Sequence, residues 1–236
     1  MIHPGEHEGF RLICYFRIFS EKDLYFSIKL VLLIIWVVSI LLPCRLEALD
    51  EIEIYLSGYG MAAKPLNKGG TFKGKGISDE TINGDPGLGF KVGLFPHVGH
   101  GYVGIELESF GNNNSMSFPI IGNIEKPKGE SSFITYHSMV NLILRYPGTL
   151  LRPYAGIGGG LSNGILTNAD IPGRRDKNFE TGTAFGYQFL GGMQLVMTER
   201  WFLFGEYKYF SANYHWKELS LKFRSEYFLG GIGFLF

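Results

Sequence analysis

The sequence predicts an all-β fold, an eight-stranded antiparallel up-and-down transmembrane β-barrel. Three observations predict it. Aromatic residues make up 15% of the 236 residues and glycine occurs 33 times, which is typical of antiparallel sheets with aromatic girdles and glycine kinks. Apolar residues alternate with small or polar ones over stretches of about ten residues, as in strands that face lipid on one side. The connections between these stretches alternate between long and short.

Eight stretches show this alternation, and none after residue 48 shows a convincing helical period. They are 51–63, 87–95, 102–110, 134–146, 152–162, 184–197, 201–209 and 223–236. In the first four, one face carries Ile52, Ile54 and Leu56, then Leu88, Phe90, Val92 and Leu94, then Val103, Ile105 and Leu107, then Val140, Leu142 and Leu144. Eight is a strand number at which a barrel can close.

The connections follow a strict order along the chain. They are long at 64–86, 111–132, 163–183 and 210–222, and short at 96–101, 147–150 and 198–200. Four long and three short connections are what an up-and-down barrel of the bacterial outer membrane needs if both termini lie in the periplasm and the long loops face outward.

Charged residues fall on one face of most strands, opposite the face that collects Leu, Ile, Val, Phe and Tyr. They are Glu53, Lys91, Glu106, Glu108, Arg145, Arg152, Glu206 and Lys208. A soluble lipocalin-like barrel would place apolar side chains inside and polar ones outside, whereas these charges suit a polar lumen in which they can pair. We predict that the eight residues form an ion-pair network that plugs the lumen.

Residues 1–48 are predicted to be a cleaved signal peptide with an extended n-region, and residues 49–236 the barrel domain. The segment Leu30 to Leu42 is apolar except for Ser39, and its length of about 13 residues suits a signal-peptide core, whereas a spanning helix needs roughly 20. Ala48 supplies a small residue for cleavage. The alternative is an uncleaved anchor helix. The predicted location is the bacterial outer membrane.

Charge and cysteine content exclude several function classes. The 22 basic and 22 acidic residues balance, and 17 of each remain after residue 48, so no nucleic-acid partner is predicted. Cys14 and Cys44 both precede the predicted cleavage point, so the barrel would hold no disulfide and no thiolate metal site.

No cofactor, metal or catalytic site is predicted. Gly156, Gly158 and Gly160 do not form a phosphate loop, because no helix follows them, and are expected to face the lumen and leave room for larger side chains. His97 and His100 have metal-like spacing but lie in a predicted solvated turn. Four further residues, which would serve a lipid A-modifying enzyme, show no recognisable nucleophile and base spacing: His137, Ser138, His215 and Ser220.

Three segments resemble the OmpA-type outer-membrane β-barrel superfamily, in particular its small porin-like proteobacterial surface barrels. They are Arg152–Gly160, Phe204–Tyr209 and Gly231–Phe236, similar to the family's fifth, seventh and last strands. The resemblance covers essentially the whole predicted barrel. It implies that Gly231, Phe234 and Phe236 form the signal that the barrel-assembly machinery reads.

The predicted function is structural, with surface interactions, and the protein is not expected to be an enzyme. The alternatives are a narrow porin-like diffusion pore and a lipid A-modifying enzyme. Predicted partners are outer-membrane lipid, the assembly machinery, an extracellular ligand at the long loops, and lipopolysaccharide. The lipopolysaccharide contacts would come from Lys64, Lys68, Lys73 and Lys75, which can pair with phosphates as point charges.

Overall fold

The computed structural model describes residues 52–66, 70–72, 75–77, 81–96, 101–117, 130–167, 179–216 and 219–236. Eight long strands are β1 (Ile52–Pro65), β4 (Thr81–Pro96), β5 (Val103–Ser117), β6 (Glu130–Arg145), β7 (Leu151–Thr167), β8 (Phe179–Val196), β9 (Trp201–His215) and β10 (Leu219–Leu235). Two short strands are β2 (Gly70–Phe72) and β3 (Lys75–Ile77). No helix with the length and apolarity needed to cross a bilayer occurs in these ranges. The predicted signal peptide, 1–48, lies outside them.

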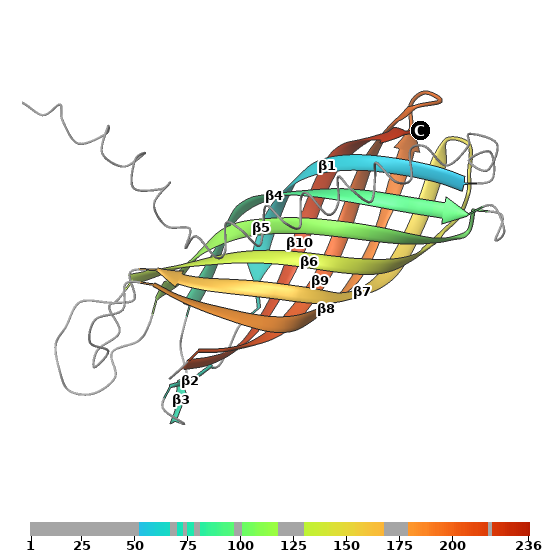
Figure 1. Cartoon of the computed structure of the whole chain (residues 1–236). Helices are drawn as coiled ribbons and strands as arrows, with labels where there is room; N and C mark the ends of the chain where they lie inside the picture. Colours follow the sequence, from blue (N-terminus) through green and yellow to red (C-terminus); the bar gives the residue numbers. More distant parts are fainter. Residues whose placement is uncertain are drawn as a thin grey trace, which may run out of the picture. The chain divides into compact units, whose positions relative to one another are not determined.

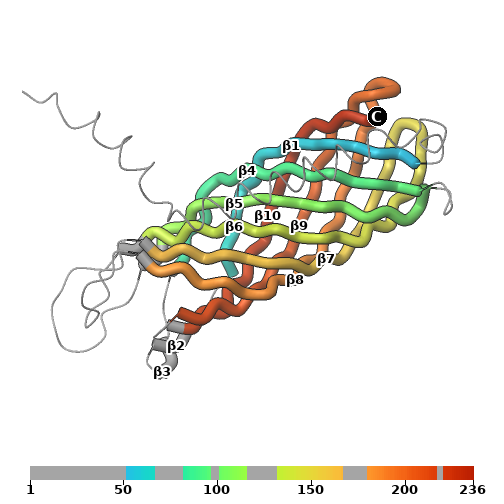
Figure 2. The backbone as a smooth tube through the Cα atoms, in the orientation of Figure 1, coloured from blue at the N-terminus to red at the C-terminus, as the bar shows by residue number. Residues whose placement is uncertain are grey.

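The eight long strands close into one antiparallel barrel (Figure 1), which confirms the predicted fold class. Each long strand pairs with the next one in the chain, and β1 completes the ring by pairing with β10, from Tyr55 opposite Leu235 to Pro65 opposite Ser225. The tube in Figure 2 follows this up-and-down path. β2 and β3 form an extra hairpin that extends the sheet along the start of β10.

The barrel has two different ends. The terminal end holds the start of β1, the end of β10 and the connections 97–102, 146–150 and 197–200, while the loop end holds the four other connections. Gly101, in the β4–β5 connection, has a φ of 72°, a left-handed conformation that favours glycine.

The strands are longer than predicted, and the additional residues lie at the loop end. The connections there span 66–80, which includes β2 and β3, then 118–129, 168–178 and 216–218. The prediction of a long loop at 210–222 is therefore wrong, because β9 continues to His215 and β10 begins at Leu219. Inward-facing apolar side chains, among them Phe210 and Tyr214, keep this part of the chain in the sheet.

The outward face changes character along the barrel axis. Towards the terminal end it is an apolar band that includes Leu56, Leu88, Phe90, Ile105, Leu107, Val140, Leu142, Ile157, Phe185, Phe189, Phe228 and Ile232, all exposed. Towards the loop end it carries polar residues, among them Lys64, Ser115, Asn163, Thr183, Asn213, Lys222 and Arg224.

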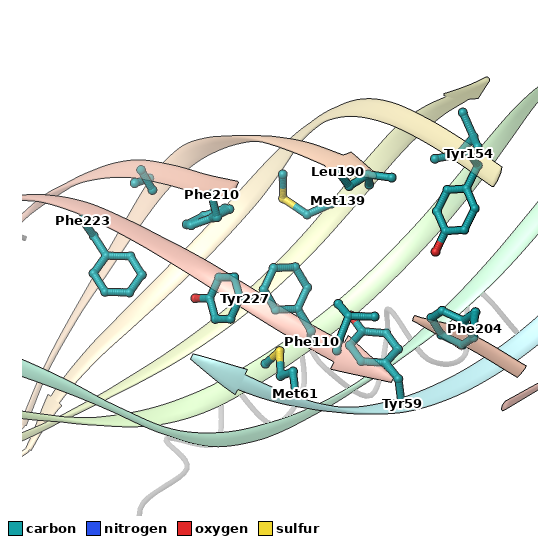
Figure 3. Packing of buried hydrophobic residues seen from close by; sticks show 14 of the residues in the cluster. Tyr59, Met61, Phe110, Met139, Tyr154, Leu190, Phe204, Phe210, Phe223 and Tyr227 are labelled. Atoms are coloured by element: carbon teal, nitrogen blue, oxygen red, sulfur yellow. The ribbon is translucent and has the colours of Figure 1, made fainter. Parts of the chain in front are cut away.

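The inward face also changes along the axis. The charged side chains lie in the terminal half, where buried aromatic rings such as Phe95 and Phe202 accompany them. Further buried aromatic side chains, among them Phe210 and Phe223, pack the loop half (Figure 3). Phe133 contacts Tyr214 and Phe223 at ring-centroid distances of 5.6 and 5.5 Å, and Phe110 contacts Tyr227 at 5.5 Å. The prediction that Phe and Tyr gather on the outward face is wrong for these residues. A wall with a polar exterior needs an apolar interior to exclude water.

Candidate functional site

The candidate site is the lumen, where the structure brings together the eight charged residues singled out from the sequence. They come from six strands, namely β1, β4, β5, β6, β7 and β9. They separate into two layers. The terminal layer holds Glu53, Arg145 and Arg152, and the central layer holds Lys91, Glu106, Glu108, Glu206 and Lys208.

The terminal layer is one carboxylate held by two guanidinium groups. Arg145 Nη1 lies 2.5 Å from Glu53 Oε1, and Arg152 Nη1 lies 3.0 Å from Glu53 Oε2. The Arg145 guanidinium also stacks over the Phe95 ring, 3.6 Å from its centroid. β1 and β7 are four positions apart in a ring of eight strands, so the Arg152–Glu53 pair crosses the barrel between opposite walls.

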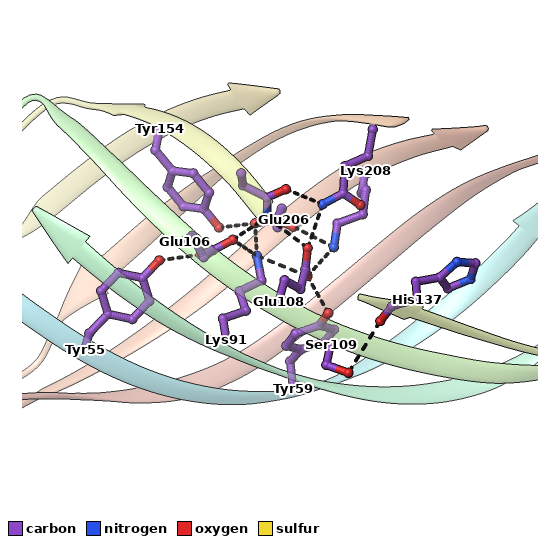
Figure 4. A network of polar contacts seen from close by, with 12 residues as sticks. Tyr55, Tyr59, Lys91, Glu106, Glu108, Ser109, His137, Tyr154, Glu206 and Lys208 are labelled. Carbon is purple, nitrogen blue, oxygen red and sulfur yellow. Dashed lines mark hydrogen bonds and ion pairs between the residues drawn. The ribbon is translucent and has the colours of Figure 1, made fainter. Parts of the chain in front are cut away.

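The central layer pairs two lysines with three glutamates (Figure 4). Lys91 Nζ lies 2.5 Å from Glu206 Oε2, 3.4 Å from Glu106 Oε1 and 3.6 Å from Glu108 Oε1. Lys208 pairs with Glu108 and lies 3.5 Å from Glu206 Oε1. Because β5 and β9 are opposite strands, the Lys208–Glu108 pair also spans the lumen.

Neutral donors add hydrogen bonds to all three glutamates. With two lysines and three carboxylates, the central layer has one formal negative charge in excess if all five groups are ionised. Tyrosine hydroxyls donate to each acid, Tyr55 to Glu106, Tyr59 to Glu108 and Tyr154 to Glu206. Buried charges are tolerated when they are paired and fully hydrogen-bonded, so these hydroxyls offset part of the desolvation cost.

Two amide side chains, from β6 and β8, also donate hydrogen bonds to the glutamates of the central layer. Asn141 Nδ2 donates to Glu106 Oε1 at 2.8 Å and to Glu108 Oε2 at 3.1 Å. Gln188 Nε2 donates to Glu108 Oε2 at 2.7 Å and to Asn141 Oδ1 at 2.6 Å. Sequence reasoning missed the tyrosines and these amides as ligands, although each occupies an inward position in the same alternation as the charges.

Gly158 makes room for this arrangement. A Cβ atom at Gly158 would lie 1.9 Å from Asn141 Oδ1, so a larger residue would displace the amide. At Gly156 a Cβ would meet the Ile143 side chain at 2.7 Å. Gly156 and Gly158 thus leave room for larger side chains as predicted, but these side chains come from the adjacent strand β6 and not from across the barrel, and at Gly160 a Cβ would meet the backbone of Ser138.

Solved structures with a similar fold are small outer-membrane barrels. Neisserial surface protein A is 12% identical with a TM-score of 0.49, and the match covers 78% of this chain and 97% of that one. OprG from Pseudomonas aeruginosa is 12% identical, with a TM-score of 0.48 and coverage of 79% and 96%. Outer Membrane Protein W from E. coli is 15% identical, with a TM-score of 0.44 and coverage of 78% and 97%. No protein-family model and no curated protein matches this chain.

A buried polar trio lies among the aromatic side chains of the loop half. His137 Nδ1 is 2.6 Å from Ser162 Oγ, which also bonds to the Tyr214 hydroxyl. The His137 ring lies between Phe110 and Phe210, at centroid distances of 4.4 and 4.3 Å. This fully buried group is part of the packing of the barrel interior.

The residues weighed for lipid chemistry are separated by the barrel wall. His137 points inward, whereas Ser138, its neighbour in β6, faces outward and lies on the other side of the sheet. His215 and Ser220 lie together on the exterior, with Nδ1 and Oγ 3.0 Å apart. The structure thus does not bring the four residues into one site.

The remaining predicted residues are placed as follows. Lys64 is exposed on β1, 3.4 Å from Glu226, and Lys75 belongs to β3. Phe236 is exposed, and Phe234 packs edge-on against Trp201 and Phe236, while Gly231 lies on the inner face of β10. Lys68, Lys73, His97 and His100 lie outside the described residues. No cluster of His, Cys, Asp or Glu suited to a metal occurs within the described ranges.

Proposed function

We propose that this chain is an outer-membrane barrel with a closed, non-conducting lumen and a structural and surface-interaction role. The observation that carries the proposal is the crossing of the lumen by ion pairs between opposite strands, Arg152 to Glu53 in one layer and Lys208 to Glu108 in the next. Side chains that meet across the diameter fill the path that ions would take. Beyond them, towards the loop end, the interior is packed with aromatic rings.

The outward apolar band supports the membrane location. On β10 the first outward charge beyond Phe236 is Glu226, and the outward side chains between them are apolar or glycine. About ten residues rising 3.3 Å each, on a strand tilted by about 40°, span about 25 Å, which is the height of the apolar band in outer-membrane barrels. Exposed Tyr102, Tyr146 and Trp201 at the terminal end suit an interfacial girdle.

Export and assembly belong to the same proposal. Cleavage after Ala48 would release a chain that begins just before β1. Gly231, Phe234 and Phe236 would then address it to the assembly machinery, and the exposure of Phe236 supports a role in recognition. Terminal-peptide mass spectrometry of the membrane-extracted protein should find no residue before position 49, and retained residues 1–48 would contradict cleavage.

The closed lumen is tested by conductance. The barrel, folded into planar bilayers, should give no stable single-channel steps. A shift in gel mobility between unheated and boiled samples verifies that the same preparation is folded. A large, stable conductance from folded protein would overturn the closed lumen and favour the diffusion-pore alternative.

Removing the pairs that cross the lumen tests what each layer contributes. Arg145→Ala, Arg152→Ala and Glu53→Ala together remove the terminal layer without leaving one of its charges buried and unpaired. This triple variant should remain closed, because the central layer still crosses the lumen. Replacing Lys208 and Glu108 by alanine as well should still give no large conductance if the variant folds by the gel criterion, because the aromatic rings towards the loop end remain.

A further inference from the structure

A histidine lies buried in the loop half of the barrel interior. His137, on β6, lies beyond the central layer towards the loop end (Figure 4), and none of its side chain is exposed. Its ring is bounded by the Phe110 ring of β5 and the Phe210 ring of β9, at centroid distances of 4.4 and 4.3 Å. The Tyr227 ring of β10 follows at 6.5 Å. Aromatic rings from three other strands therefore surround a side chain that readily takes up a proton in water.

The hydrogen bonds of this histidine suit a neutral ring. His137 Nδ1 lies 2.6 Å from Ser162 Oγ, which also bonds to the Tyr214 hydroxyl, whereas Nε2 is buried and has no hydrogen-bond partner among the described residues. Both hydroxyl hydrogens are used only if Tyr214 donates to Ser162 and Ser162 donates to Nδ1. In that arrangement Nδ1 is an acceptor, and the ring carries a single hydrogen, on Nε2.

A second hydrogen on the ring would reverse this chain. Both ring nitrogens of a charged imidazole are donors, so Ser162 would have to accept from Nδ1 and turn its own hydrogen towards Tyr214. The hydrogens of the Tyr214 hydroxyl and of Nε2 would then have no acceptor among the described residues. Burying a charge and leaving donors unpaired both cost free energy. The packing of the loop half therefore disfavours a protonated His137.

The charged groups around the ring do not offset a positive imidazole. Those that act on His137 are Lys208 of β9 and Glu108 of β5. Lys208 is itself a buried cation, and Glu108 is already bound by Lys208, by a tyrosine hydroxyl and by two amides. The other titratable groups that pack here are two buried tyrosines, Tyr214 of β9 and Tyr227 of β10. No carboxylate among the described residues is thus free to pair with a protonated His137.

We propose that His137 makes the packing of the loop half sensitive to acid. The closed packing keeps the ring neutral, whereas a loosened form of this half, in which the ring meets water, takes up a proton. A histidine in water is half protonated at about pH 6.5. The closed packing is therefore fully favoured above that pH and loses ground to the loosened form by up to about tenfold for each pH unit below it. This pH-sensitive element does not depend on whether the lumen conducts.

The test is amide hydrogen exchange of the folded barrel in vesicles, followed by mass spectrometry and expressed as protection relative to an unstructured chain. In residues 132–137 of β6 and 210–215 of β9, protection should fall about thirtyfold between pH 7.5 and pH 5.0. In residues 140–144 and 202–206, which lie nearer the terminal end of the same strands, it should change by less than about threefold.

Two variants assign the effect to the buried ring. His137→Gln removes the titrating group, while its side-chain carbonyl can still accept from Ser162, so protection of the loop half should stay within about threefold over the same pH range. His215→Gln is the matched control, because His215 Nδ1 also lies 3.0 Å from a serine hydroxyl, that of Ser220, but on the exposed outer face of the barrel. This control should lose protection as the unmodified barrel does. Gel mobility verifies that each variant is folded.

Protection of the loop half that is independent of pH in the unmodified barrel, or that falls equally in His137→Gln, would overturn the proposal. Nitrogen NMR of the imidazoles gives a second reading on the unmodified barrel. At pH 5.0 the His137 ring should remain neutral while the exposed His215 ring is protonated. A His137 ring that is protonated at pH 5.0 in a barrel with undiminished protection would also refute the inference. Conductance of the same preparation tests the closed lumen separately.

Discussion

Replacing Lys208 by methionine tests whether the central layer stabilises the barrel. The ammonium group is fully buried, pairs with Glu108 and lies 3.5 Å from Glu206, and its stem passes over the Phe110 ring with Nζ 4.4 Å from the centroid. Methionine keeps much of the volume but leaves three glutamates facing Lys91 alone. Removing one partner of a buried pair costs about 3–5 kcal/mol, and we expect about 3 because Glu108 keeps Lys91 at 3.6 Å and its neutral donors.

The measurement is urea unfolding in lipid vesicles, followed by tryptophan fluorescence and by gel mobility. Lys208→Met with Glu108→Gln restores the charge balance of the layer, so this double variant should be more stable than Lys208→Met alone. Glu108→Gln by itself serves to close the double-mutant cycle. A loss below about 1 kcal/mol for Lys208→Met, or no recovery in the double variant, would refute the view that charge pairing organises the lumen.

Two further predictions probe the wall. Gly158→Ala should lower the free energy of unfolding by about 1–3 kcal/mol, because its Cβ would lie 1.9 Å from Asn141 Oδ1. Gly60→Ala should change it by less than about 0.5 kcal/mol, because its Cβ would meet nothing within 4 Å. Equal losses of stability in vesicle unfolding would be evidence against the packing role of Gly158. Leu142→Arg, at an outward position of the apolar band, should cost about 2–4 kcal/mol in the same assay, and Ser115→Arg, nearer the loop end, should cost at most about 1. Equal costs at these two positions would contradict the placement of the band in lipid.

The sequence was sufficient to predict the strands and the direction of their charged side chains, because both follow from the two-residue period of a strand. Glu106, Glu108 and Lys208 point inward as the alternation requires. The partners were not predictable, because they depend on how the closed sheet is staggered and on which strands become opposite. Nothing in the local sequence around Lys208 or Glu108 indicates that they meet across the diameter.

The missed ends of the strands have one physical cause, which is clearest on β9. Glu206 and Lys208 face inward and Tyr207 and Tyr209 face outward, but the next inward residue is Phe210 and the next outward one is Ser211. Side chains of β9 keep alternating between inward and outward along the whole strand. Beyond Tyr209, however, the inward positions are apolar and the outward positions are polar, the reverse of the arrangement before it. To an analysis of periodicity this exchange looks like the end of a strand, and the prediction indeed stopped at Tyr209.

On β10 the outward face alone changes, from the exposed Phe228 to Glu226, while the inward residues Tyr227 and Leu229 are apolar on both sides of this point. Tyr209 and Glu226 are paired, and Glu226 is paired in turn with Lys64, so the change on the outward face falls on one rung across three strands. A barrel wall in lipid needs an apolar exterior, and a wall in water needs an apolar interior. A break in hydrophobic phase without a break in the sheet, as on β9, therefore marks the point along a strand at which its outward face leaves the lipid.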